Sequence, residues 1–144
     1  MLELYQEWAK EVKEAIKVSK TITDLYKRLE RFEELRKKAR TELQEIVANW
    51  AKEKGIFCPF VDISKKYKPG VRGEYDVIIS RMTIFPIRTN YEATKVLVES
   101  EKGVLDTLQH EFAHHLAPFT LSTPPHGADF TKALSSLSEK IAST

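Results

Sequence analysis

The residues most able to do chemistry in this 144-residue sequence are its four histidines, which all lie between positions 110 and 126. His110, Glu111 and His114 form an H-E-x-x-H pattern. On an α-helix, at about 100° per residue, His114 falls about 40° from His110 and one turn along. Two imidazoles at this spacing can bind one metal ion, and Glu111, about 60° from His114, can touch a water on that ion without being a ligand. The pattern therefore predicts a metal site with a carboxylate beside it.

A catalytic zinc ion usually has three protein ligands and one water, so the two histidines need a third partner. His126 is the preferred candidate, because it follows a proline-containing loop and opens the run HGADF. Asp129 in the same run is the alternative, since carboxylates also bind zinc. His115 points about 100° away from His114, and we expect it to pack at the rim of the cleft or in the core.

The apolar pattern around the histidines predicts a helix from Val104 to about Ala117. The face opposite His110 and His114 carries four large apolar side chains, which are Leu105, Leu108, Phe112 and Leu116. This helix should therefore bury one side and turn its histidines toward a cleft. Asp106, one turn before His110, is either a hydrogen-bond partner of that histidine or an ordinary residue of the first turn.

The first 54 residues contain no glycine or proline and predict two helices. The first carries an apolar stripe of Leu2, Tyr5, Trp8, Val12 and Ile16. A break follows at residues 19–23, where Thr21 or Thr23 caps a second helix that ends at Gly55. We expect these helices to pack antiparallel as a hairpin, with their stripes serving as core or as a seam between subunits.

From residue 55 onward the pattern changes to short β-prone runs and then back to helices. A loop with a Pro69-Gly70 turn precedes two expected strands, around Tyr75–Ile79 and Ile84–Ile87. Residues 96–98 add a third strand, unless 91–99 are helical, and a last helix runs from near His126 to about Ile141. The sequence thus predicts an α+β protein with a helical region at 1–54 and a second region at 55–144.

Composition excludes several classes of protein. With 23 basic and 21 acidic residues the net charge is +2, which gives no strong argument for nucleic acid as the main partner. The single cysteine, Cys58, allows no intrachain disulfide, so a reducing, cytoplasmic setting is expected. No apolar run approaches the roughly 20 residues of a membrane span, and the first residues do not resemble a signal peptide.

Residues 104–130 resemble the SprT-like zinc metalloproteases. In that family a TL-x-HE-x-x-H helix is followed, after a variable loop, by HG-x-x-F, and both pieces are present, from Thr107 to His114 and from His126 to Phe130. The resemblance implies a zincin-like core, one zinc ion bound by His110, His114 and His126, and a catalytic Glu111. The family includes Spartan-type proteases, which degrade proteins crosslinked to DNA. Many members also carry a cysteine-rich zinc ribbon, which a sequence with only Cys58 lacks.

We therefore expect a peptidase in which Glu111 takes a proton from a zinc-activated water and delivers it to the leaving amine. Its protein or peptide substrate would add as a strand to the sheet in the region 75–87. Two other classes compete with this one. A DNA-associated binding module with a structural metal could contact phosphate through Arg36, Lys37, Lys38 and Arg40, although neighbouring glutamates favour a solvated face. The N-terminal helices could instead form a homo-oligomer or shield the cleft as a pro-segment.

Overall fold

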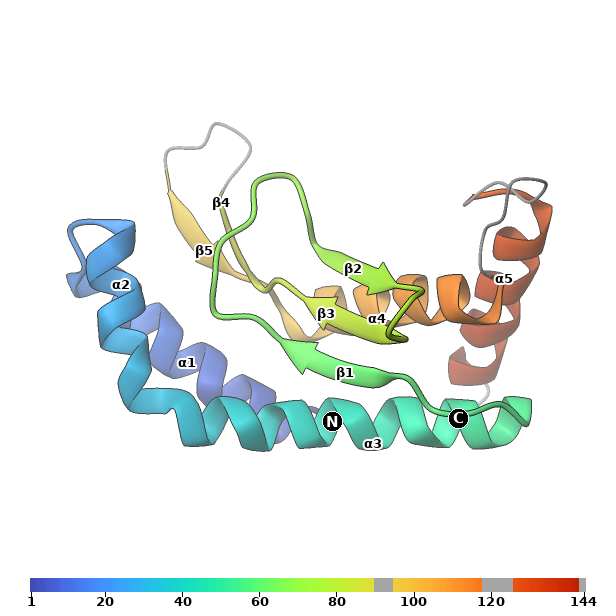
Figure 1. Ribbon diagram of the computed structural model, residues 1–144. Helices are drawn as coiled ribbons and strands as arrows, with labels where there is room; N and C mark the ends of the chain where they lie inside the picture. Colours follow the sequence, from blue (N-terminus) through green and yellow to red (C-terminus); the bar gives the residue numbers. More distant parts are fainter. Residues whose placement is uncertain (90–94, 118–125, 143–144) are drawn as a thin grey trace.

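The computed structural model describes residues 1–89, 95–117 and 126–142. The chain is α+β, as predicted (Figure 1). In chain order the elements are α1 (Glu3–Val18), α2 (Ile22–Leu29), a 3₁₀ turn (Glu30–Phe32), α3 (Glu33–Lys54), β1 (Phe60–Ile63), β2 (Gly73–Asp76), β3 (Arg81–Ile84), β4 (Ile87–Thr89), β5 (Val96–Val98), α4 (Glu101–Leu116) and α5 (Ala128–Ala142). Within these described ranges no helix combines the length and apolar character needed to cross a membrane.

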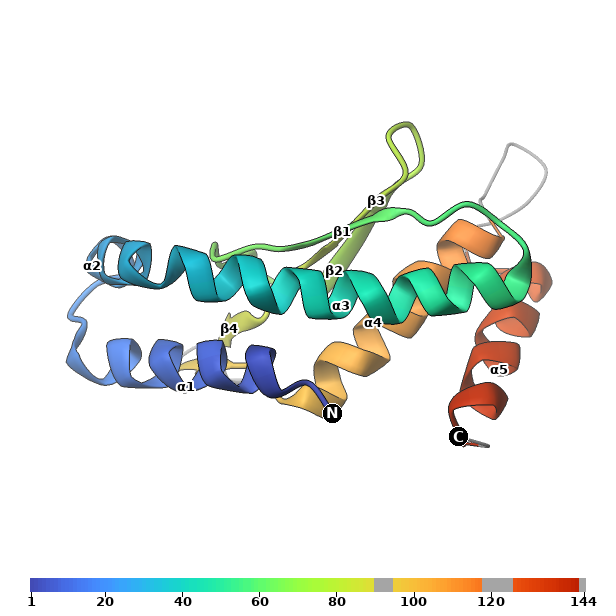
Figure 2. The same cartoon turned by 90° about the horizontal axis from the view of Figure 1, so that it is seen from below.

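The predicted N-terminal helical hairpin is confirmed, because α1 packs antiparallel against α3 (Figure 2). Both apolar stripes are buried in the core of the chain itself, through Tyr5, Trp8 and Val12 from α1 and Ala39, Leu43 and Val47 from α3. The same hydrophobic cluster continues into residues 55–144, where the rings of Trp50 and Phe112 lie 5.7 Å apart. The helices of 1–54 and the helix with the histidines therefore share one core.

The predicted cap at Thr21 is also confirmed, since its side chain accepts a hydrogen bond from the Asp24 N–H at 3.0 Å. The prediction of one continuous helix from there to Gly55 was wrong. The 3₁₀ turn ending at Phe32 separates α2 from α3 and changes the direction of the chain (Figure 1). This bend lets α2 pack on α1 while α3 runs along β1, and no glycine or proline marks it. Gly55, with φ of 67°, ends α3 as expected.

The main sheet has the strand order β1-β3-β2, with β1 parallel and β2 antiparallel to β3. The Phe85 N–H donates to the Arg72 carbonyl, whereas the Ser80 carbonyl accepts from Phe60 on the other side of β3. Hydrogen-bonded and non-bonded pairs alternate along an antiparallel ladder. The peptide groups of residues 72, 74 and 76 therefore face β3, and those of Gly73 and Tyr75 point outward from the sheet.

The two strands expected in this region have other bounds than predicted. The first ends at Asp76, because its carboxylate accepts hydrogen bonds from the N–H groups of Ile78 and Ile79 and closes a turn. Val77 and Ile79, predicted to lie in the strand, are exposed in that turn. The second is divided into β3 and β4 at Pro86, which has no N–H for a ladder. The third expected strand is confirmed as β5, and residues 91–94 of its helical alternative lie outside the described residues.

Candidate metal centre

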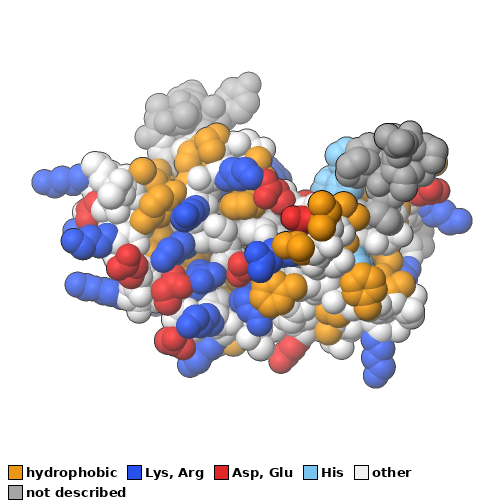
Figure 3. Space-filling view, in the orientation of Figure 1, with side chains coloured by type: hydrophobic (Ala, Val, Ile, Leu, Met, Phe, Trp, Pro, Cys, Tyr) orange, Lys and Arg blue, Asp and Glu red, His pale blue; other side chains and the backbone are white. Residues whose placement is uncertain are grey.

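The candidate metal centre is built on α4, whose other side is buried in the core. The helix begins at Glu101 rather than Val104, because the Ser100 hydroxyl caps it by accepting from the Gly103 N–H. Of the four apolar residues predicted to face the core, Leu108 and Phe112 are fully buried, whereas Leu105 and Leu116 are half-buried against it. The opposite side brings histidines to the surface next to the β2–β3 turn (Figure 3).

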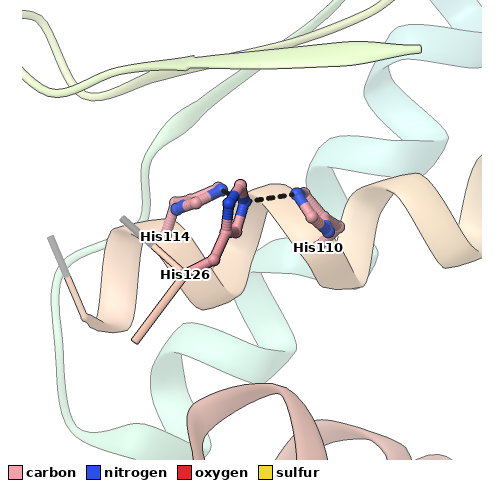
Figure 4. A group of neighbouring side chains, drawn as sticks. All are labelled: His110, His114 and His126. Carbon is pink, nitrogen blue, oxygen red and sulfur yellow. Dashed lines mark hydrogen bonds between the residues drawn. The ribbon is translucent and has the colours of Figure 1, made fainter. Parts of the chain in front are cut away.

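The structure brings His110, His114 and His126 together around one point (Figure 4). The Nε2 atom of His126 lies 3.1 Å from Nε2 of His114 and 3.4 Å from Nε2 of His110. All three donor atoms lie within 4.8 Å of one another. Donors about 2.0–2.1 Å from a tetrahedral zinc ion are about 3.3 Å apart. The three histidines are therefore close enough to bind one metal ion.

The alternative third ligand does not join this cluster. Asp129 is exposed, and it lines a different hollow with Lys54 and Lys132, between the ends of α3, α4 and α5. His126 lies just before α5, and the first turn of that helix carries Phe130. Within the described residues, the group able to hold a metal contains His126 and not Asp129.

Phe130 forms an apolar support for all three imidazoles. Its ring centroid lies 5.0 Å from that of His110, 4.4 Å from that of His114 and 4.8 Å from that of His126. In the sequence, Phe130 stands out only as the last residue of the HG-x-x-F piece. Phe130 therefore packs against each histidine of the cluster as well as anchoring α5. Its place in the run HGADF was the one sequence signal for this role.

The electrostatics of the cluster favour neutral imidazoles. Burial lowers the pKa of His110, and the nearby His126 lowers it further. Burial, followed by the charges of His110 and His126, lowers the pKa of His114 to about 4. A neutral imidazole is the form that binds a metal ion. At neutral pH these two histidines are therefore already in their metal-binding form.

Glu111 lies beside the histidines, buried against β2. Only 5% of its surface is exposed, and burial together with the charge of Glu74 raises its pKa to about 7. A carboxyl group with this pKa can accept and release a proton near neutral pH. It borders an open cleft of about 470 Å³ whose lining is Gly70, Val71, Arg72, Gly73, Asp106, Thr107, His110 and Glu111.

Gly73 is a residue of the candidate site that was not predicted from the sequence. A Cβ atom at this residue would lie 2.6 Å from Cγ2 of Thr107 and 3.1 Å from Cγ of Glu111. Only glycine lets β2 approach α4 this closely without displacing these side chains. The sequence shows a glycine at the end of a loop, but it does not show which helix passes beneath it.

The sequence also singled out two other polar residues of α4, His115 and Asp106. His115 is buried, with Nδ1 2.7 Å from the Tyr75 hydroxyl and Nε2 3.1 Å from the Phe57 carbonyl oxygen. It is a packing residue, as expected, and it ties β2 to the segment before β1. Asp106 lines the cleft, but it is exposed and makes no hydrogen bond with His110.

The basic stretch on α3 does not present a single cationic face. Arg36 donates to the Ile63 carbonyl and pairs with Glu33. Arg40 donates to the Val61 carbonyl at 2.8 Å. These two arginines therefore hold β1, which leaves the lysines between them as the outward cations of the stretch.

No protein-family model, curated protein or solved structure matches this chain.

Proposed function

We propose that this protein is a zinc-dependent metalloendopeptidase of the SprT-like type, with a zincin-like core. The observation that carries the proposal is the convergence of three histidine Nε2 atoms beside a buried carboxyl group on the same helix. A purely structural zinc site is usually closed by four protein ligands. Three histidines, of which His110 lines an open cleft, would leave a position for water and substrate.

Each residue of the site has a distinct role in this proposal. His110, His114 and His126 hold the zinc ion. When bound, zinc lowers the pKa of a water at its open position to about 7 and polarises the carbonyl group of the peptide bond. Glu111 accepts the proton of that water and then delivers it to the leaving amine, as a buried carboxyl group beside the open cleft can do.

The substrate runs along the outer edge of β2 in this proposal. The peptide groups of Gly73 and Tyr75 point outward there, and Gly73 lies against Glu111. An extended peptide can pair with such an edge as an additional strand. Main-chain pairing tolerates many substrate sequences, and the cleft beside His110 receives a side chain. The resemblance to the Spartan-type proteases extends the proposal to proteins bound or crosslinked to DNA.

Metal content and cleavage, measured on the same preparations, test this function. We expect one zinc ion per chain and cleavage of a denatured protein that chelation abolishes and zinc restores. Glu111→Gln should keep the zinc and reduce cleavage by about 10²–10⁴-fold, the contribution typical of a general acid–base. His126→Ala should lose zinc and activity, whereas the matched control Asp129→Asn should keep both.

Two outcomes would contradict the peptidase. One is unchanged cleavage by Glu111→Gln. The other is a zinc-bound wild-type protein that cleaves no substrate, with or without DNA in the assay, which would favour a structural metal in a binding module.

A further inference from the structure

Exposed apolar side chains gather beside the metal centre. The β2–β3 turn exposes 47% of Val77, 89% of Ile78 and 57% of Ile79, and the segment before β1 exposes 66% of Phe57. Figure 3 shows hydrophobic side chains around this turn, with histidine side chains visible above them in the same view. We call Phe57, Val77, Ile78 and Ile79 the apolar rim. An exposed cluster of this kind commonly marks a binding surface.

The fold itself does not require apolar residues at this turn. Hairpin turns favour glycine, asparagine and aspartate, whereas valine and isoleucine favour strands. The turn is held without help from the apolar side chains, because the Asp76 carboxylate accepts from the N–H groups of Ile78 and Ile79. Ser80, with φ of 51°, completes it. The exposed valine and isoleucines therefore need a reason other than folding.

The apolar rim is joined to α4 through His115, by Phe57 directly and by Tyr75 two residues before Val77. The Tyr75 hydroxyl and the Phe57 carbonyl oxygen both lie within hydrogen-bond distance of His115, the neighbour of the metal-site residue His114. The rings of Phe57 and His115 meet edge to face at 4.8 Å. These contacts hold both parts of the rim at the C-terminal half of α4, where the histidines converge.

We propose that the apolar rim binds apolar side chains of the polypeptide substrate on one flank of the bond that is cleaved. This inference rests on the proposed peptidase and narrows its substrate to unfolded chains with exposed apolar segments. The open edge of β2 leads directly into the turn. At about 3.3 Å per residue, Ile78 lies within about 10 Å of Tyr75 along the chain. A peptide paired with Gly73 and Tyr75 therefore reaches the rim within about three residues of leaving the edge.

An unfolded polypeptide with apolar segments can occupy the β2 edge and the apolar rim together. Folded proteins bury their apolar segments, and only an extended chain can pair with β2 and place apolar side chains on the rim at the same time. Main-chain pairing by itself selects no sequence. The apolar rim thus supplies a preference that the edge of β2 lacks.

Peptide binding to zinc-loaded Glu111→Gln protein tests this proposal without requiring catalysis. Three fluorescent peptides of equal length would carry valine and isoleucine on the N-terminal flank, on the C-terminal flank, or serine on both. We expect tighter binding of one apolar peptide, measured by fluorescence anisotropy. Adding Ile78→Ser should weaken that binding about tenfold, the factor for burying one large aliphatic side chain.

Val18→Ser is the matched control, because Val18 is 57% exposed at the far end of α1. It should leave the apolar preference intact. Equal binding of all three peptides, or a preference that Ile78→Ser does not reduce, would overturn the proposal. So would light scattering that shows a dimer lost in Ile78→Ser, since the rim would then be covered by a second copy.

The two proposals fail in different ways in this experiment. Wild-type cleavage without an apolar preference would remove the role of the rim and leave the peptidase. An apolar preference that depends on Ile78, in a protein that cleaves nothing, would keep the rim as a peptide-binding surface and remove the peptidase.

Discussion

The two edges of the main sheet differ in whether side chains hydrogen-bond to their outward peptide groups. On β1, side chains from α3 cover the outward peptide groups: Arg40 and Arg36 donate to the carbonyls of Val61 and Ile63, and Gln44 accepts from the Val61 N–H at 2.8 Å. On β2, the outward peptide groups of Gly73 and Tyr75 have no such side-chain cap among the described residues.

This difference makes the β2 edge the place where the proposed peptidase would accept another chain. An unpaired strand edge is a template for pairing with other polypeptides, and proteins normally cover it. The long helix α3 closes the β1 edge with long polar side chains. The β2 edge stays open beside Glu111 and the histidines, which is where the proposed peptidase needs a strand to bind.

The largest expected difference between the two edges is in how folding stability depends on pH. It comes from one carboxyl group near each edge, in metal-free protein. The folded-state pKa of Glu111, about 7, lies above the ordinary value of 4.5. Ionisation of Glu111 therefore opposes folding increasingly as pH rises from 4.5 to 7. Glu33, near β1, has its pKa lowered mainly by a hydrogen bond from Arg36, so it stabilises the fold above its unfolded pKa and less as pH falls.

Urea unfolding at several pH values measures this contrast. Glu111→Gln removes this ionisation. The free energy of unfolding of the variant, relative to that of the wild type, should therefore be about 3 kcal/mol more favourable to the fold at pH 8 than at pH 4. Glu33→Gln should destabilise at pH 8 and lose this effect in acid. A Glu111→Gln effect that does not change with pH would contradict the first expectation.

The second-largest effect is expected for Gly73→Ala, which changes how the open edge of β2 lies against α4. The added Cβ would lie 2.6 Å from Cγ2 of Thr107 and would push α4 away from β2. We expect kcat/KM for a peptide to fall about 100-fold, as for a displacement of about 1 Å at a catalytic group.

Thr107→Ser in the same chain provides a matched rescue. It removes Cγ2 and keeps the hydroxyl that donates to the Gly103 carbonyl at 2.9 Å. The double variant should therefore recover most of the lost activity. Full activity of Gly73→Ala alone would show that the close approach of β2 to α4 is unimportant.

Arg40→Ala should weaken the covered edge. The change removes the hydrogen bond to the Val61 carbonyl and a guanidinium 4.6 Å from the centre of the Phe60 ring. Together these contacts contribute about 1–2 kcal/mol to the free energy of unfolding. Lys37→Ala on the same helix, whose ion pair with Glu34 is exposed, should cost less than about 0.5 kcal/mol. Equal effects of both variants in urea unfolding would remove the special role of Arg40.

The smallest expected effect tests pairing of the substrate with the open edge. A single N-methyl group on a peptide bond that pairs with Gly73 or Tyr75 removes one hydrogen bond. Binding to the Glu111→Gln protein should then weaken about three- to tenfold. Methylation of the next peptide bond, whose N–H points away from β2, should have little effect. A scan along the peptide without this alternation would argue against strand pairing.

Much of the fold could be predicted because its signals are local. The apolar stripes of the N-terminal helices, the cap at Thr21 and the stop at Gly55 each depend on residues within one or two helical turns. The break at Phe32 and the turn at Val77 could not be predicted. The first carries no glycine or proline, and the second places strand-forming residues in a turn that the Asp76 carboxylate closes.

For the site, the sequence by itself determined that His110 and His114 lie on one face of a helix with Glu111 beside them, because one helical turn fixes that relation. Only the tertiary structure decided that His126 rather than Asp129 reaches them, that Phe130 supports all three rings, and that Gly73 brings an open strand edge against Glu111. These contacts join residues from separate elements. Their distances depend on how α4, α5 and β2 pack, which no local pattern in the sequence encodes.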